Sequence, residues 1–413
     1  MCYNNIVETL IGTDVKLRII QMKVLFLDWN SYGNKDIIDA FKELGNGNGY
    51  EIEMYPYDNH IERDDAKFAN KFKEDLSAKN PDYVMSFNFF PIISKTCNET
   101  GIKYISWVYD SPALNLFSYT LINPCNYVFV FDSQMYEIFA SQGIKTVFYL
   151  PMAAAVGRYD LFEKSEDLRR KWGGTISFVG NLYTESHNYY DQIENELSDY
   201  ARGYLNGLMK AQMGIYGIDL VEKSLPGSVM KEMVDALGAK PNYDGVETYE
   251  YLYSNYVINR KITAVERSQF LTMIGEKYEV NLYTGDKNFK AKGINNRGKV
   301  EYYSEMPYVF KNSDINLNIT LRSIQRGMPL RCIDIMGCEG FLLTNYQEDF
   351  MRFFSPGEDY VFYDSRQDLM DKIEYYLLHE DERQAIAQRG YEKIKAGHTY
   401  RHRLEEIFDI VRS

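Results

Sequence analysis

Short apolar runs alternate with helical stretches along most of the chain, and this alternation constrains the fold more than any other feature. In the first 150 residues the runs are Val24–Leu27, Tyr50–Tyr55, Tyr83–Phe87, Tyr104–Val108, Tyr127–Phe131 and Thr146–Leu150. Continuous apolar strands are typical of a parallel sheet that helices cover on both faces. The pattern therefore predicts a doubly wound α/β domain over residues 22–152.

Helical stretches separate several of these runs, as a parallel sheet requires. We expect helices over Asp64–Ala78, Pro91–Thr100 and Ser133–Gln142. Ser133 is expected to cap the third helix, and Gly101 and Gly143 are placed to end the second and third.

A second series of apolar runs begins after a charged linker, residues 153–172. Its members are Ile176–Gly180, Tyr278–Tyr283, Val300–Tyr303, Ile315–Ile319, Phe341–Thr344 and Tyr360–Tyr363. These runs predict a second α/β domain over residues 173–396. Residues 188–277 have helical periodicity and are too long and too apolar for a loop, so they are read as a helical insertion. Met22 reads as a natural start, which makes residues 1–21 an extension.

Charge and composition exclude several classes of function. The formal net charge of −13 argues against nonspecific binding to nucleic acid or to an anionic membrane. No run approaches the roughly 20 apolar residues of a transmembrane helix. The five cysteines are odd in number and scattered without metal-site spacing, which favours a reducing, cytoplasmic setting.

The segment from Pro329 to Asn345 is the strongest candidate for chemistry. Pro329 suits the first turn of a helix, and Gly337 is placed to end that helix in a left-handed conformation. Arg331 and Asp334 then share one helix face. Arginine and free amides at a helix N-terminus can hold a diphosphate, and the carboxylate can accept the ribose hydroxyls of a sugar nucleotide. The alternative, a solvated helix carboxylate, fits poorly with the apolar neighbours of Asp334.

Other polar residues follow predicted strands, where open α/β sheets bind ligands. Arg322 and Arg326 lie after the strand Ile315–Ile319, and Arg326 alone is explained by a basic surface loop. Gly180 and Asn181 end the first strand of the second domain. A glycine there lets the backbone approach a phosphate or sugar, although a plain turn explains it equally well.

Two strand ends of the first domain also carry candidates. Asp110 follows the strand Tyr104–Val108 and could act as a general base towards a hydroxyl group. It could equally cap a helix that begins after Pro112. Asn88 and Phe89 follow the strand that ends at Phe87 and are placed to contact the same substrate.

Six motifs, taken in order, carry a resemblance to a known family. They are Trp107–Pro112, Phe178–Asn181, Asn318–Arg322, Pro329–Arg331, Gly340–Thr344 and His398–Arg401. Together they resemble the CgeB-like (spore-maturation) family of GT-B glycosyltransferases. That family joins an N-terminal domain of unknown function to a C-terminal group-1-like glycosyltransferase domain. The resemblance covers nearly the whole chain from about Met22.

The resemblance implies a GT-B fold, in which two Rossmann-like domains face a cleft and a last helix, residues 397–413, crosses back onto the first domain. It implies a nucleotide-sugar donor on the second domain and an acceptor on the first. The implied donor residues are Asp334, Arg331, Arg322, Gly180 and Asn181. The expected roles of Asp110 as the base and of Asn88 and Phe89 as acceptor contacts rest on their positions at strand ends. Many GT-B enzymes have Glu where Asp334 stands. Related enzymes also place a Glu where Arg326 stands, so a retaining mechanism of that type is not supported.

The expected activity is transfer of a sugar from a nucleoside-diphosphate sugar, by default a UDP-sugar, to a hydroxyl of a glycan, a protein or another cell-envelope acceptor. The arginines can offset the charge of the diphosphate, so we expect neither a metal nor another cofactor. The alternative is a non-catalytic protein on the same fold that binds nucleotide sugars or serves in spore or surface assembly.

Overall fold

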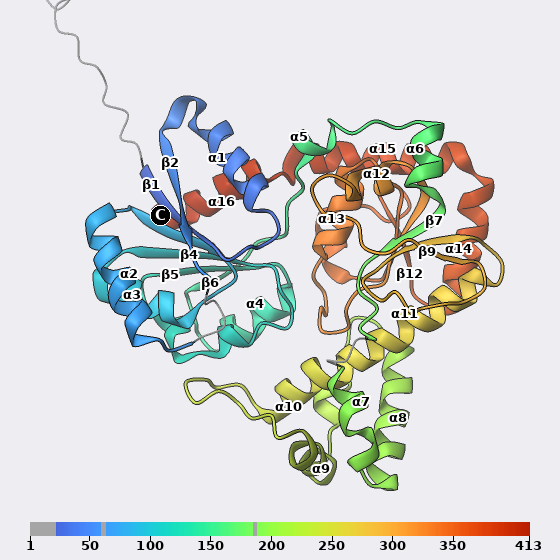
Figure 1. Ribbon diagram of the computed structural model, residues 1–413, viewed down its shortest axis with the longest axis horizontal. Coiled ribbons are helices and arrows are strands. Elements are labelled where there is room, and N and C mark those ends of the chain that lie inside the picture. Colours follow the sequence, from blue (N-terminus) through green and yellow to red (C-terminus); the bar gives the residue numbers. More distant parts are fainter. Residues whose placement is uncertain (1–21, 59–62, 185–187) are drawn as a thin grey trace, which may run out of the picture.

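The computed structural model describes residues 22–58, 63–184 and 188–413 and shows two α/β domains side by side above a helical lobe (Figure 1). The predicted extension, residues 1–21, lies outside the described residues. Within the described ranges, no helix is both long and apolar enough to cross a membrane.

The sheet of the first domain runs in the order β2-β1-β3-β4-β5-β6, and all neighbouring strands are parallel. Leu25 and Leu27 pack into one core, whereas Val24 and Phe26 pack into another on the opposite face, as the period of a strand requires. The strands are β1 (Met22–Asp28), β2 (Tyr50–Pro56), β3 (Tyr83–Phe87), β4 (Lys103–Val108), β5 (Asn126–Val130) and β6 (Val147–Tyr149).

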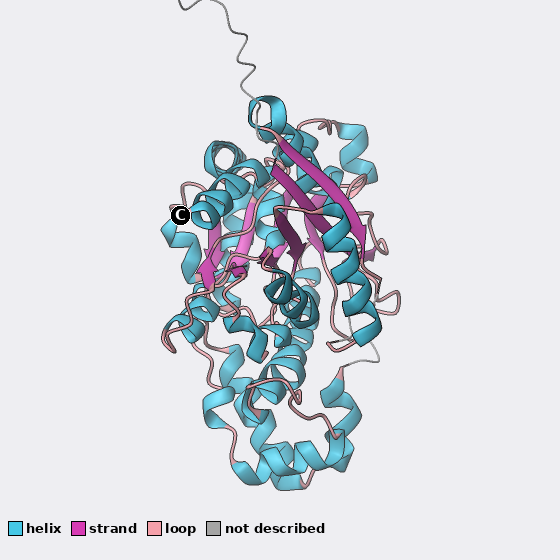
Figure 2. Cartoon of the chain, turned by 90° about the vertical axis from the view of Figure 1, so that its left-hand side faces the viewer, coloured by secondary structure: helices cyan, strands magenta, loops and turns pink. Residues whose placement is uncertain are grey.

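Helices cover both faces of this sheet (Figure 2). They are α1 (Asn34–Asn48), α2 (Ala66–Lys79), α3 (Pro91–Thr100) and α4 (Ser133–Ala140), with short 3-10 turns η1 (Leu114–Phe117) and η2 (Tyr119–Ile122). The predicted cap of α4 was wrong by one residue. Asp132 is the N-cap, because its carboxylate accepts a hydrogen bond from the amide of Gln134.

The sheet of the second domain runs in the order β12-β11-β10-β7-β8-β9, again with parallel neighbours. Chain order reverses between β7 and β10, which makes their carboxyl ends the switch point where such sheets bind ligands. The strands are β7 (Gly174–Val179), β8 (Val280–Tyr283), β9 (Ile294–Asn296), β10 (Ser313–Asn318), β11 (Leu342–Asn345) and β12 (Val361–Tyr363). The predicted strand Val300–Tyr303 was wrong, because those residues turn before α12 and the edge strand β9 precedes them.

The helices packed around this sheet come from both ends of the domain. They are α6 (Glu166–Lys171), α12 (Met306–Lys311), α13 (Leu330–Gly337), α14 (Arg366–Leu378) and α15 (Glu380–Gly397), with the turn η6 (Glu348–Arg352). One hydrophobic cluster runs from Phe26 and Trp107 of the first sheet to Ile333 of α13 and Phe408 near the C-terminus. The two domains therefore share a core.

The predicted helical insertion forms a lobe with a hydrophobic core of its own, which includes Leu205, Met233 and Ile262. Its helices are α7 (Tyr189–Ile193), α8 (Asp199–Met213), α9 (Gly227–Leu237), α10 (Tyr249–Tyr253) and α11 (Asn259–Gly275), with the short elements η3 (Glu194–Glu196), η4 (Glu222–Ser224) and η5 (Ser254–Ile258). We call the loop between α9 and α10, residues 239–248, the arm. It extends under the first domain (Figure 1).

The linker and the last helix join the domains a second time. The linker contains α5 (Val156–Tyr159), and Ala154 donates its amide to the carbonyl of His398. The last helix, α16 (Tyr400–Arg412), lies on α1 of the first domain, with the ring of Phe408 5.9 Å from that of Phe41 and 4.7 Å from that of Tyr50. This is the crossing that the resemblance implies.

Helix α13 packs against the linker so closely that its last residue has no room for a side chain. The sequence assigned Gly337 to a left-handed helix end, but Gly337 is helical, and Glu339 takes the left-handed conformation with φ 57°. A Cβ at Gly337 would lie 2.7 Å from the Cβ of Ala154 and 3.1 Å from the ring of Tyr159. Pro329 is the N-cap of α13 and not its first residue.

We predict that Gly337→Ala destabilises the protein by about 1–3 kcal/mol, because the added methyl forces α13 away from the linker. Gly207→Ala is the matched control, since Gly207 lies within α8 and a Cβ there meets nothing within 4 Å. That substitution should stabilise the lobe by about 0.5–1 kcal/mol through helix propensity. Thermal unfolding measures both, and a Gly337→Ala midpoint at or above the parent's would contradict the close packing.

Candidate functional site

Two hollows lie at the carboxyl ends of the two sheets. The α13 hollow, of about 400 Å³, is lined by the ends of β7 and β8, the segment 299–302, the start of α13 and Tyr32 of the first domain. The Asp110 hollow, of about 270 Å³, is lined by the ends of β3 and β4, the segment 112–116, Trp29 and Tyr256 of the helical lobe. Each hollow thus takes residues from both halves of the molecule.

The α13 hollow brings together Asp334, Arg331, Gly180 and Asn181, four of the residues that the sequence predicted for one ligand. Helix α13 begins at the switch point of the sheet, and its N-cap, Pro329, offers no side-chain hydrogen bond to the first amides. A helix N-terminus with free amides attracts an anion. The hollow therefore suits an anionic ligand that also carries hydroxyl groups.

Asp334 is 1% exposed and is held by a linker residue that the sequence did not suggest. Tyr159 donates its hydroxyl to Oδ1 of Asp334 at 2.6 Å, and the hydroxyl of Tyr302 lies 3.5 Å from the same oxygen. Among the described residues none bonds Oδ2, which leaves this oxygen for a ligand. Burial raises the pKa of the Asp334 carboxyl to about 6, and the charge of Arg331 and the Tyr159 hydrogen bond lower it only in part.

Two cations line the α13 hollow. The Arg331 guanidinium contacts the sulfur of Met306 and lies 5.6 Å from the ring of Phe310, and it has no carboxylate within ion-pair distance in the described residues. Lys299 is the second cation and was missed from the sequence, because its neighbours were read as a strand. Both charges remain available to an anionic ligand.

A buried arginine holds the Gly180–Asn181 turn in place. Arg267, on α11, donates to the carbonyls of Asn181 and Ile319, at the ends of β7 and β10. It is 8% exposed, so its charge acts from beneath the hollow. The sequence offered no signal for Arg267, which lies 86 residues from the turn that it holds.

Arg322 lies outside the α13 hollow, which corrects the position expected for it. Its Nε donates to Oε2 of Glu266 at 2.6 Å, and its Nη1 donates to the carbonyl of Ile215 at 2.7 Å. The guanidinium also stacks on the ring of Tyr216, 4.1 Å away. With these partners buried around it, Arg322 fastens the helical lobe to the loop after β10.

The Asp110 hollow brings together Asp110, Asn88 and Phe89, the three residues predicted for the second substrate. Asn88 has a left-handed backbone, with φ 59°, and its Nδ2 donates to Oδ2 of Asp110 at 2.6 Å. Its Oδ1 accepts the amides of Tyr109 and Asp110 at 3.2 and 3.3 Å. Asn88 therefore aims the carboxylate, whereas Phe89 is buried against Tyr104 and forms a wall.

Asp110 does not cap a helix. The next helical element is η1, whose N-cap is Ala113 without a side-chain hydrogen bond. Desolvation by the walls of the hollow raises the pKa of the Asp110 carboxyl, and the Asn88 amide lowers it. Because the residue as a whole is exposed, water screens the first effect. The carboxylate is accessible and oriented, as a proton acceptor must be.

The loop after β1 connects the two hollows. Trp29 lines the Asp110 hollow, and three residues later Tyr32 lines the α13 hollow and packs on Tyr302, with ring centres 5.3 Å apart. Nearby, Ser111 and Ser323 exchange two hydrogen bonds of 3.0 Å between the domains. The loop after β1 therefore forms part of the wall of both hollows.

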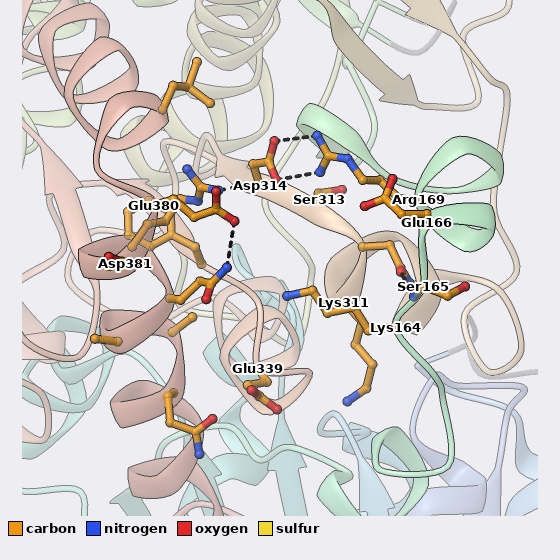
Figure 3. A pocket seen from close by; sticks show the side chains of 18 residues that line it. Lys164, Ser165, Glu166, Arg169, Lys311, Ser313, Asp314, Glu339, Glu380 and Asp381 are labelled. Carbon is orange, nitrogen blue, oxygen red and sulfur yellow. Dashed lines mark hydrogen bonds and ion pairs between the residues drawn. The ribbon is translucent and has the colours of Figure 1, made fainter.

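A larger hollow, of about 780 Å³, lies at the opposite, amino end of the second sheet. Asp314 accepts a hydrogen bond from Nη2 of Arg169 there at 2.6 Å. Figure 3 shows this pair, with Lys164 and Lys311 elsewhere on the same lining. Parallel sheets bind substrates at the other end, so this hollow is not the candidate site. In the described parts of the chain, no three His, Cys, Asp or Glu residues gather as a metal site would require.

Comparisons with known proteins agree with this geometry. Residues 262–409, which include α13 and Arg331 and Asp334, match a family model described as "Glycosyl transferase-like". Among curated proteins, no sequence matches this chain.

Solved structures match over nearly the whole chain. A glycosyltransferase from Rickettsia africae is 11% identical, with a TM-score of 0.54, over 95% of this chain and 98% of its own. Anabaena HepE in complex with UDP and glucose is 11% identical, with a TM-score of 0.52, over 95% and 100%. Sucrose-phosphate synthase from Thermosynechococcus elongatus is 10% identical, with a TM-score of 0.52, over 95% and 98%. The chain has the GT-B fold, which confirms the fold class predicted from its sequence.

We predict that Asp334 makes the folded protein less stable as the pH rises from about 4 to about 6. The carboxyl has a pKa of about 6 when folded and an ordinary value of 3.8, so the unfolded chain releases its proton first. A difference of that size corresponds to about 3 kcal/mol. Arg331, Arg158, Asp36, Tyr159 and Tyr302 surround the carboxyl and stay in place in the Asp334→Asn variant.

The measurement is the free energy of unfolding of parent and Asp334→Asn between pH 4 and pH 8. The variant should gain stability relative to the parent up to pH 6, after which the difference should stay constant. Parallel pH profiles would show that the carboxylate is not destabilised by burial.

Proposed function

We propose that this protein is a glycosyltransferase that moves a sugar from a UDP-sugar to a hydroxyl group of a glycan, protein or other cell-envelope acceptor. The observation that carries the proposal is the α13 hollow, in which Asp334, Arg331 and the Gly180–Asn181 turn meet at the switch point of the second sheet. The "Glycosyl transferase-like" match covers the same helix, and UDP and glucose occur in the structurally similar Anabaena protein. The CgeB-like family is the subgroup that we propose.

The donor would lie with its ribose at Asp334 and its diphosphate at the start of α13. Oδ2 of Asp334 can accept ribose hydroxyls, because Tyr159 occupies Oδ1. Arg331, Lys299 and the first amides of α13 offset the negative charge of the diphosphate. We propose that these groups make a divalent metal unnecessary.

The acceptor would lie in the Asp110 hollow. Its hydroxyl oxygen attacks the anomeric carbon of the donor sugar, the bond from that carbon to the diphosphate breaks, and the hydroxyl proton passes to Asp110. Asn88 orients the carboxylate through the 2.6 Å hydrogen bond to Oδ2. UDP then leaves with the two electrons of the broken bond, and Arg331 and Lys299 stabilise its added charge.

Titration calorimetry with UDP in the presence of EDTA tests the donor site. The parent should bind UDP, and Asp334→Asn should bind it about 10- to 100-fold more weakly, because a hydrogen bond to a charged group contributes about 1.5–3 kcal/mol. Asp314→Asn is the control, since Asp314 lies at the amino end of the same sheet and outside the α13 hollow. Equal binding by all three proteins would contradict the ribose assignment, and a requirement for Mg²⁺ or Mn²⁺ would contradict metal independence.

Asp110→Asn tests the base. Release of UDP from the UDP-sugar that binds best, with water as acceptor, should slow by about 10²–10⁴-fold, while the affinity for UDP stays at the parental value. Asp39→Asn, on the exposed side of α1, should leave the rate unchanged. A near-parental rate for Asp110→Asn would remove Asp110 from the mechanism. Binding of UDP-sugars without any release of UDP would favour the non-catalytic alternative.

A further inference from the structure

A groove of about 400 Å³ runs between the first domain and the arm of the helical lobe. Its walls are residues 63–64, the outer face of α3, the turn η2 and the tip of the arm at Tyr243 and Asp244. We call it the arm groove. Neither the proposed donor site nor the proposed base uses any of its residues.

The arm is fastened to the first domain, so the groove is preformed. Asp244 accepts the amide of Tyr119 on its carbonyl at 3.0 Å, and Val246 donates its amide to the carbonyl of Phe117 at 2.8 Å. The Asp244 carboxylate pairs with Nε of Arg63 at 2.9 Å. Binding of a flexible chain costs less entropy when the groove is already ordered than when the groove must become ordered on binding.

Two tyrosines at the groove are unusually exposed. Tyr119, on η2, is 63% exposed and Tyr243, on the arm, is 77% exposed. A tyrosine ring offers a flat apolar face beside a polar hydroxyl, and these two rings lie at the same groove, where a ligand could contact both. Sugar rings have flat faces of C–H groups, which can stack on a tyrosine ring. Their hydroxyls lie at the edge, where they can hydrogen-bond to the tyrosine hydroxyl.

Polar groups of both kinds line the same groove. Within the described residues, the buried Nη2 of Arg63 has no hydrogen-bond partner, and the side chains of Lys95 and Asn98 make no hydrogen bond. Asp64 and Asn123 add acceptor oxygens. A neutral, hydroxyl-rich chain uses donors and acceptors together, because each hydroxyl is both.

The groove continues from the Asp110 hollow. Arg63 donates from Nη1 to Oδ1 of Asn115 at 2.7 Å, and Asn115 lines the Asp110 hollow. Phe90 lines that hollow and the next residue, Pro91, lines the groove. A chain that places one end at Asp110 therefore reaches the groove by crossing the Arg63–Asn115 pair.

We propose that the arm groove binds the saccharide chain of the acceptor, beyond the sugar unit whose hydroxyl lies at Asp110. The inference rests on the proposed function, because it makes the groove the outer part of the acceptor site. It narrows the acceptor from any hydroxyl compound to an oligosaccharide of several units.

Binding of oligosaccharides to the full chain, without nucleotide, tests the groove. The probes are hexasaccharides of glucose, N-acetylglucosamine, galactose and mannose, together with a 12-residue peptide of Gly, Ser and Thr, followed by saturation-transfer NMR and calorimetry. At least one hexasaccharide should bind the parent. The variant Tyr119→Ala/Tyr243→Ala should bind that sugar at least about tenfold more weakly, through loss of two ring contacts.

Two controls separate a binding role from a structural one. Tyr119→Phe/Tyr243→Phe keeps both rings and should retain most of the affinity, and Tyr200→Ala removes an equally exposed ring, 64%, from α8 and should retain all of it. Failure of every hexasaccharide to bind, binding of the peptide in their place, or full affinity in the double alanine variant would overturn the inference. UDP titration tests the donor site separately. If the parent does not bind UDP, the proposed function is contradicted, and the oligosaccharide titrations alone then decide whether the groove binds a saccharide.

Discussion

The ion pair between Arg158 and Asp36 holds the linker, and with it the support of the α13 hollow, against the first domain. Nε and Nη2 of Arg158, on the linker, donate to the two oxygens of Asp36, on α1, at 2.7 and 2.9 Å, and the Asp36 side chain is 2% exposed. Loss of one partner from such a buried pair costs about 3–5 kcal/mol, because the other charge stays buried. The next residue, Tyr159, holds Asp334, so one turn of the linker contacts both the first domain and the carboxylate of the α13 hollow.

The sequence predicted those strands and helices that depend on the pattern of apolar residues within one short segment. Largely apolar runs such as Tyr83–Phe87 became buried parallel strands, because a strand covered on both faces buries every position. The buried Ser86 in this run is hydrogen-bonded to the hydroxyl of Tyr104. The run Val300–Tyr303 is also rich in residues that favour strands, but it is a turn, and the edge of the sheet is occupied by Ile294–Asn296. Whether Ile294–Asn296 or Val300–Tyr303 pairs with β8 depends on packing within the whole domain, and the composition of the two segments does not show it.

The residues of the site also fall into those that a local sequence pattern predicted and those that it did not. Asp334 and Arg331 were recognisable because a helix of eight residues places them on one face, beside a strand end. Tyr159 and Arg267 were not, because they reach the site from 175 and 86 residues away. Arg322 was misplaced for the converse reason. Arg322 follows β10, at the end of the sheet where ligands bind, but its guanidinium is hydrogen-bonded to Glu266 of α11.

The contacts that join the lobe and the two domains restrict how the domains can move relative to each other. The first and second domains are joined at the linker, at Ser111–Ser323, and through Asp132, which accepts the amide of Gln325 at 2.8 Å, while the arm holds the first domain from below. A hinge in the linker alone cannot separate the domains, because the other contacts must break with it. Separation of the two domains would therefore have to break the Ser111–Ser323 and Asp132–Gln325 hydrogen bonds together with those of the arm, so several distant contacts resist the same movement.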